Sequence, residues 1–139
     1  MTAPGLARRS ASPEVAGVTL DTGALIAIER GDPRLQALLD KAAAVGADLA
    51  VPAGVVAQAW RGSPRQARLA RFLALAVVDV VALDEPDARA AGTLCGRVGT
   101  ADVIDASVVV CARMRGHAVI TGHPDDLAAL DPSLPLVVL

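Results

Sequence analysis

The chain alternates short apolar runs with longer amphipathic segments. Five short runs are typical of buried strands, at residues 18–20, 48–51, 77–83, 118–121 and 136–139. Between them, apolar side chains recur at helical spacing in segments 21–30, 33–44, 52–61, 63–75, 84–97, 102–115 and 124–130. Strands that alternate with helices indicate a parallel sheet covered by helices on both faces. We therefore expect an α/β fold, a three-layer α/β/α sandwich around a parallel sheet of four or five strands.

Local signals support these helix boundaries. Asp32 and Ser63 each stand before a proline, which is the pattern of a helix cap followed by proline in the first turn. In the segment 102–115, one stripe runs from Val103 to Met114, and we expect this stripe to face the core. We expect Cys111, at the same helical spacing, to be buried as well.

Composition fits one globular domain. The chain has 139 residues, of which 53% are hydrophobic, and this excludes a disordered protein. Residues 1–17 lack periodicity and are expected to form a flexible tail before a domain at 18–139. The formal net charge of −2 neither requires nor excludes a nucleic-acid partner. Two cysteines, no secretory signal and no apolar run of 18 residues favour a cytoplasmic protein outside the membrane.

Acidic residues follow the predicted strands or begin the predicted helices. Asp21 ends the first strand, and Asp102 and Asp105 lie three residues apart at the start of a helix. If these carboxylates meet at one sheet edge, their repulsion calls for a cation, and Mg²⁺ or Mn²⁺ prefers such oxygen ligands. Asp21 and Asp102 also have a simpler interpretation as helix caps. Asp105 lies inside the helix, where an unpaired buried carboxylate is costly. Asp125 and Asp126 are expected in a helical first turn.

Four segments occur in an order and spacing that is informative as a set: VTLDTGA (18–24), VPAGVVAQAWR (51–61), DVIDA (102–106) and AVITGHPDDL (118–127). In these segments the chain resembles PIN domains, and among them the VapC-type toxin ribonucleases of toxin–antitoxin pairs. The resemblance covers residues 18–139. It implies an endoribonuclease that depends on Mg²⁺ or Mn²⁺, that cleaves RNA such as tRNA or rRNA, that binds a VapB-like antitoxin and that often forms a homodimer.

The resemblance also assigns roles by position. Asp21 matches the first metal-binding acid, Asp105 matches the acid at the start of the long helix, and Asp102 matches an extra acid just before it. Thr121 matches the hydroxyl residue beside the final acid of the family pattern.

Two positions depart from this pattern. The family usually has Glu where this chain has Gln58, and Asp where it has His123. Gln58 offers a carbonyl oxygen without charge, while His123 offers a ring nitrogen that suits Mn²⁺ better than Mg²⁺, or faces solvent. Both residues are expected to complete the site or to orient the attacking water. The departures also leave open a degenerate domain that serves as a protein-interaction module.

Arg61, Arg65 and Arg68 follow one another at helical spacing. Such a row can contact RNA phosphates, or it can be an ordinary solvated helix face. Trp60 beside it fits a core or a dimer interface better than a platform for stacking RNA bases.

A remote alternative comes from Leu20-Asp21-Thr22-Gly23-Ala24, which also spells the signature of retroviral-type aspartic proteases. That fold is nearly all β, whereas this chain has repeated helix starts.

Overall fold

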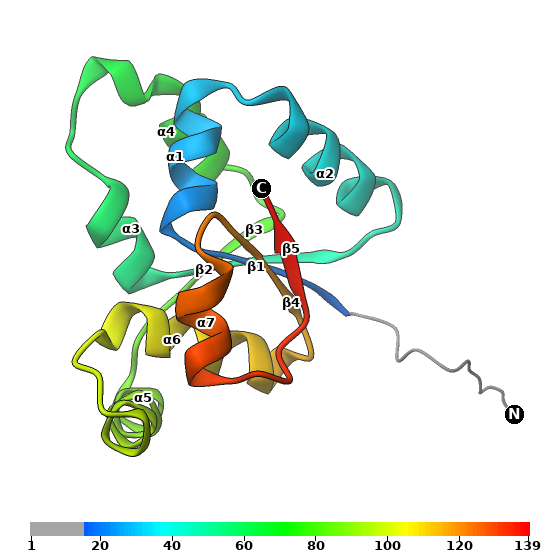
Figure 1. Cartoon of the computed structure of the whole chain (residues 1–139). Coiled ribbons are helices and arrows are strands. Elements are labelled where there is room, and N and C mark those ends of the chain that lie inside the picture. The colour runs from blue at the N-terminus through cyan, green and yellow to red at the C-terminus, as the bar shows by residue number, and fades with distance from the viewer. Residues whose placement is uncertain (1–15) are drawn as a thin grey trace, which may run out of the picture.

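A computed structural model describes residues 16–139 (Figure 1). Its single sheet is five-stranded and entirely parallel, in the order β3-β2-β1-β4-β5. The strands are β1 (Gly17–Leu20), β2 (Asp48–Pro52), β3 (Val78–Val81), β4 (Ala118–Thr121) and β5 (Leu136–Val138). The helices are α1 (Thr22–Arg30), α2 (Pro33–Ala44), α3 (Ala53–Ala59), the short 3₁₀ helix η1 (Pro64–Gln66), α4 (Ala67–Leu73), α5 (Glu85–Val98), α6 (Val103–Arg115) and α7 (Pro124–Leu130).

This architecture confirms the predicted α/β/α sandwich with a parallel sheet. Helices α1, α2 and α4 pack together over one face of the sheet, and α6, flanked by α5 and α7, covers the other (Figure 1). It excludes the all-β fold that the protease alternative requires. The predicted tail lies outside the described residues except for its last two positions. Within residues 16–139, no helix has the length and apolar character needed to cross a bilayer.

The central strands are buried on both faces. Leu20 of β1 faces the α1 side and is fully buried with Leu25, Leu35 and Leu69 from the helices above it. Thr19 faces α6, where its hydroxyl lies 3.0 Å from Nδ1 of the buried His117. Burial lowers the pKa of His117, which favours the neutral form of the imidazole. The expectation that Cys111 is buried is confirmed.

The apolar stripe of α6 is shorter than predicted. Val103 and Met114 are 50% and 67% exposed, so the prediction that both face the core is wrong. A helix of 13 residues is about 20 Å long, whereas a strand of four residues is about 13 Å long. Both ends of α6 therefore extend past the sheet, and only its middle turns are covered.

The segment between β2 and β3 also departs from the prediction. The helix that begins after Pro52 ends at Ala59, two residues early, because Trp60 adopts an extended conformation. Gly62 has a positive φ of 70°, and Ser63 precedes a proline, which disfavours a helical backbone. The next helix consequently begins as the single 3₁₀ turn of η1 before α4 continues it.

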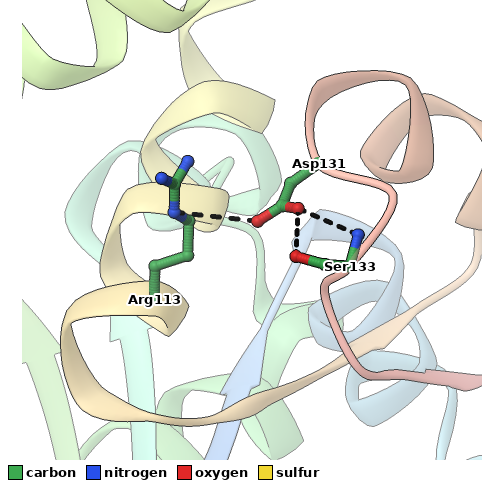
Figure 2. A network of polar contacts seen from close by, with 3 residues as sticks. All are labelled: Arg113, Asp131 and Ser133. Carbon is green, nitrogen blue, oxygen red and sulfur yellow. Dashed lines mark hydrogen bonds and ion pairs between the residues drawn. The ribbon is translucent and has the colours of Figure 1, made fainter.

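A polar network fixes the end of α6 to the turn before β5 (Figure 2). Asp131 accepts hydrogen bonds from the hydroxyl and the backbone N–H of Ser133, at 2.6 Å and 2.9 Å. Its other carboxylate oxygen lies 3.7 Å from Nε of Arg113. The hydrogen bonds from Ser133 lower the pKa of Asp131, which keeps the carboxylate charged and the turn closed.

Helix α3 lies against α6 because one residue has no side chain. A Cβ atom on Gly54 would lie 2.7 Å from Cδ1 of Ile104, which is the neighbour of Asp105. The absence of that Cβ lets α6 approach the first turn of α3, and the approach helps to set where Asp105 stands.

This contact predicts a coupling between two substitutions. Gly54→Ala should destabilise the wild-type protein more than it destabilises the Ile104→Val variant, in which Cδ1 is absent. We expect a coupling free energy of about 1 kcal/mol from chemical denaturation of the double-mutant cycle. Gly92→Ala in α5, whose Cβ would meet open space, is the control and should stabilise by about 0.5–1 kcal/mol. Additive effects at 54 and 104 would contradict this packing account.

Candidate functional site

The carboxyl ends of β1 and β4 lie side by side, and they bring the first two candidate residues together. Leu20 pairs with Ile120 across these strands, and the backbone N–H of Asp21 donates to the carbonyl of Ile120. Asp21 follows β1 and is only 5% exposed, while Thr121 ends β4 and is fully buried. Both side chains are therefore fixed at one edge of the sheet.

Two glycines bring the turn after β4 against the first turn of α1. A Cβ atom on Gly23 would lie 3.2 Å from the backbone nitrogen of Gly122 and 3.4 Å from a carboxylate oxygen of Asp21. The two backbones approach each other closely here because neither residue has a side chain. This approach places the 121–123 turn next to Asp21.

Asp21 and Asp102 are both helix caps, as the simpler interpretation proposed. The Asp21 carboxylate accepts a hydrogen bond of 3.0 Å from the backbone N–H of Ala24, and Asp102 accepts one of 3.0 Å from that of Asp105. Only one oxygen of each carboxylate is used by these caps. Capping therefore leaves the second oxygen of the Asp21 carboxylate available for a ligand, whereas the Asp102 carboxyl also shares a hydrogen bond with Asp105.

Asp105 is the acid most affected by its surroundings. Its pKa rises from 3.8 to about 7, first because the carboxyl is partly buried. A hydrogen bond with the Asp102 carboxyl and the negative charges of Asp102, Asp126 and Asp21 raise the pKa further. Acids from the end of β1, the N-cap of α6 and the first turn of α7 therefore all act on Asp105.

Gln58 joins α3 to the beginning of α1. Its amide oxygen accepts a hydrogen bond of 2.5 Å from the hydroxyl of Thr22, the residue after Asp21. The side chain reaches the site edge from an exposed position on α3. It brings an oxygen donor there without adding a charge.

His123 and Thr121 are linked through the backbone. The buried hydroxyl of Thr121 accepts a hydrogen bond of 2.8 Å from the N–H of His123, and the carbonyl of Thr121 accepts one from Leu139. The residue His123 is exposed and does not cap α7 with its side chain. Thr121 thus shapes the turn, while the imidazole is accessible to solvent.

The three arginines do not form one helical row. Arg61 lies between α3 and η1, where Nη1 donates to the carbonyl of Trp60 at 2.7 Å. Arg65 is in η1, and Arg68 is in α4 with its guanidinium near the carbonyl of Glu29. The early end of α3 breaks the continuous spacing that the sequence predicted. All three residues are nevertheless exposed on one stretch of chain.

Asp126 also contributes to the charge around Asp105, although the sequence did not single it out as a metal ligand. It lies in the first turn of α7 with Asp125, as predicted, but its charge also acts on Asp105 of α6. Its position three residues after His123 was a usable signal. A helix that starts at Pro124 presents its first-turn acids next to the preceding strand end.

Within residues 16–139, no group of three or more His, Cys, Asp or Glu side chains is arranged so that it could hold a metal ion. Mg²⁺ is typically held by one or two carboxylates, with water in its other positions. Asp21 is buried, Asp105 is partly buried, and the charges around Asp105 are negative. These two acids fit a metal ion that is held by one or two carboxylates and by water. They do not fit a site built only from protein ligands.

A concave surface also lies away from these acids. A groove of about 860 Å³ runs along α2 and α4 and includes Leu35, Leu39 and Phe72. Its acid Asp32 caps α2 through Arg34 and Leu35. This groove is mostly aliphatic, whereas Asp105 has an unusual charge environment, which makes the acids the stronger candidate site.

These features define an α/β/α protein with a parallel sheet and acids gathered at the carboxyl edge. The model of the PIN domain family matches residues 18–131, so the chain belongs to the PIN domain family. Proteins of this family are generally nucleases and generally use divalent metal ions. No curated protein sequence matches the chain significantly.

Solved structures show the same fold at low sequence identity. A toxin–antitoxin complex from Klebsiella pneumoniae contains a chain 18% identical to this one, with a TM-score of 0.67 over 88% of this chain and 97% of that chain. VapBC2 from Rickettsia felis, bound to a promoter DNA fragment, is 15% identical, with a TM-score of 0.65 and coverages of 87% and 97%. FitAcB from Neisseria gonorrhoeae is 20% identical, with a TM-score of 0.60 and coverages of 86% and 95%.

The raised pKa of Asp105 predicts how stability depends on pH. The folded protein binds this proton more tightly than the unfolded chain, so stability without metal falls as the pH rises from 3.8 towards 7. Asp105→Asn removes the charge and should raise the melting temperature at pH 8 by about 2–4 °C, measured in EDTA. At pH 4, where Asp105 is protonated in the fold, the two proteins should melt alike. A lower melting temperature for the variant at pH 8 would contradict the charge repulsion.

Proposed function

We propose that this PIN domain is a metal-dependent endoribonuclease, the toxin of a type II toxin–antitoxin pair, which hydrolyses RNA phosphodiester bonds. The observation that carries the proposal is the crowding of Asp105 by Asp21, Asp102 and Asp126 at the carboxyl edge of a PIN fold. Crowded carboxylates repel one another unless a cation binds between them. Membership of the PIN domain family and the negative charges around Asp105 thus both support a site for a divalent cation.

Asp21 and Asp105 are the proposed metal ligands, with Asp102 in support. When bound, Mg²⁺ or Mn²⁺ supplies a Lewis acid and a water of lowered pKa for attack on phosphorus. Asp21 is held rigidly by its cap bond to Ala24 and by burial, so its free oxygen has a fixed position. Asp102 orients the first turn of α6 and thereby Asp105.

Three uncharged or weakly basic groups complete the proposed site. The Gln58 oxygen, held at Thr22, accepts a hydrogen bond and orients the attacking water. Thr121 fixes the turn that carries His123. The exposed imidazole of His123 is available to water, to a phosphate or to Mn²⁺.

RNA is the proposed substrate, with tRNA or rRNA as the source. Arg61, Arg65 and Arg68 are exposed on the segment that follows Gln58 along the chain. Arginines contact phosphates through bidentate hydrogen bonds, and charge neutralisation dominates such binding. We assign these three residues to the RNA backbone.

The proposed partner is a VapB-like antitoxin, because the similar solved structures include VapBC2 and toxin–antitoxin complexes. We further propose that the toxin is a homodimer and acts in the cytoplasm. Both cysteines of the described residues are free thiols, which fits a reducing compartment.

The catalytic assignment predicts the behaviour of Asp21→Asn. Asparagine retains the cap on α1, so the variant should fold. It lacks the charge for a divalent ion, so cleavage of total tRNA or rRNA with Mg²⁺ or Mn²⁺ should fall to the level seen in EDTA. Expression of the variant should no longer inhibit growth. Cleavage equal to that of wild type would show that Asp21 is not a ligand.

Restoring the family acids predicts a gain of metal affinity. Gln58→Glu and His123→Asp each add one negative charge beside Asp21, so the double variant should bind Mn²⁺ about tenfold or more tightly, measured by calorimetry. The matched control is Gln36→Glu on α2, which changes charge outside the site and should leave affinity unchanged. If wild type cleaves no RNA while the double variant does, the natural chain is a degenerate domain, and interaction with a partner becomes its function.

A further inference from the structure

One buried side chain outside the acidic site connects three segments that border it. Gln66, in η1, is only 4% exposed. Its Nε2 donates to a carboxylate oxygen of Glu29 at 2.7 Å and to the carbonyl of Ala59 at 2.8 Å. Its Oε1 accepts from the backbone N–H of Arg61 at 2.8 Å. Both amide hydrogens and the amide oxygen are thus used at once.

Helix α3 needs such a partner. It has seven residues, fewer than a helix needs to be stable alone in water, and it lacks a side-chain hydrogen bond at its N-cap. Its last carbonyls have no partner within the helix, and Ala59 contributes one of them. Gln66 satisfies this carbonyl and also the N–H of Arg61, two residues further on. The Arg61 guanidinium also donates to the carbonyl of Ala57, so Gln66 is the buried one of two side chains that hold the end of α3.

The connection reaches the proposed site through adjacent residues. Ala59 is the neighbour of Gln58, whose oxygen accepts from Thr22 at the start of α1. Glu29 lies near the end of the same helix α1 that begins after Asp21. Gln66 consequently fixes the end of α3 relative to the helix that is anchored at Asp21. A shift of Ala59 would carry Gln58 away from Thr22.

We propose that Gln66 is a positioning residue of the active site, which holds the end of α3 so that the Gln58 oxygen stays at Thr22 beside Asp21. This inference rests on the proposed nuclease function for its kinetic consequence. Its structural consequence, the placement of the Gln58 amide, does not depend on that function. The two parts are therefore tested separately.

Three variants test the proposal. Gln66→Met keeps the length of the side chain and removes all three hydrogen bonds. Gln66→Glu keeps an acceptor for Arg61 but cannot donate to Ala59, and combining it with Glu29→Gln removes the added charge repulsion. Gln36→Met is the matched control, since Gln36 is exposed on α2 and donates to Asp40 away from the site. All proteins are compared at a temperature at which their thermal denaturation curves show that they are folded.

For kinetics, cleavage of RNA in Mn²⁺ is measured for each folded protein. We expect kcat to fall about tenfold in Gln66→Met and in Gln66→Glu with Glu29→Gln, while KM for RNA changes less than about twofold in the latter. A merely structural role would lower the apparent activity only in proportion to the unfolded fraction. Wild-type kcat in folded Gln66 variants would overturn the proposal.

For geometry, the ¹H–¹⁵N signals of the Gln58 side-chain amide and the Thr22 backbone amide are recorded without metal. Both should shift in the Gln66 variants and stay in place in Gln36→Met. Unchanged signals would overturn the positioning role even if wild type cleaves no RNA. Shifted signals in a chain without cleavage would instead support the positioning of Gln58 and reject the nuclease function.

Discussion

Repulsion between carboxylates at one edge of the sheet is the constraint on which this site depends. The parallel order places the ends of β1 and β4 side by side, and α6 and α7 add their first-turn acids to the same place. Partial burial of Asp105 prevents water from screening these charges fully. Such a cluster of carboxylates destabilises the folded protein at neutral pH. A cation that relieves the repulsion binds the folded state and therefore stabilises it.

The same side chains build the fold and the proposed site. Asp21 ends a strand, caps α1 and lies buried beside the turn after β4, while Asp102 caps α6. Because a cap uses only one carboxylate oxygen, capping and metal binding are compatible. The glycines at 23 and 122 allow the approach that places these elements together. The position of the site is therefore set by backbone contacts rather than by a deep cavity.

Local features were predictable from the sequence, and tertiary ones were not. The strands and the caps at Asp21 and Asp102 follow from signals within a few residues, and the alternation of strands with helices along the chain predicts the parallel sheet. The early end of α3 comes with the extended conformation of Trp60 and with the hydrogen bond from Gln66, seven residues after Ala59, and no periodicity reveals that contact. The exposure of Met114 depends on how far α6 extends past the sheet. The effect of Asp126 on Asp105 likewise requires α7 to be placed beside α6.

The central claim is that a divalent ion binds between acids that otherwise repel one another. Anomalous diffraction at the manganese edge, from crystals of the wild-type chain soaked in Mn²⁺, tests it most directly. If the ion binds between these acids, a peak appears within coordination distance of the carboxylates of both Asp21 and Asp105. Saturating Mn²⁺ without a peak at these residues, or a peak that contacts neither carboxylate, would contradict it.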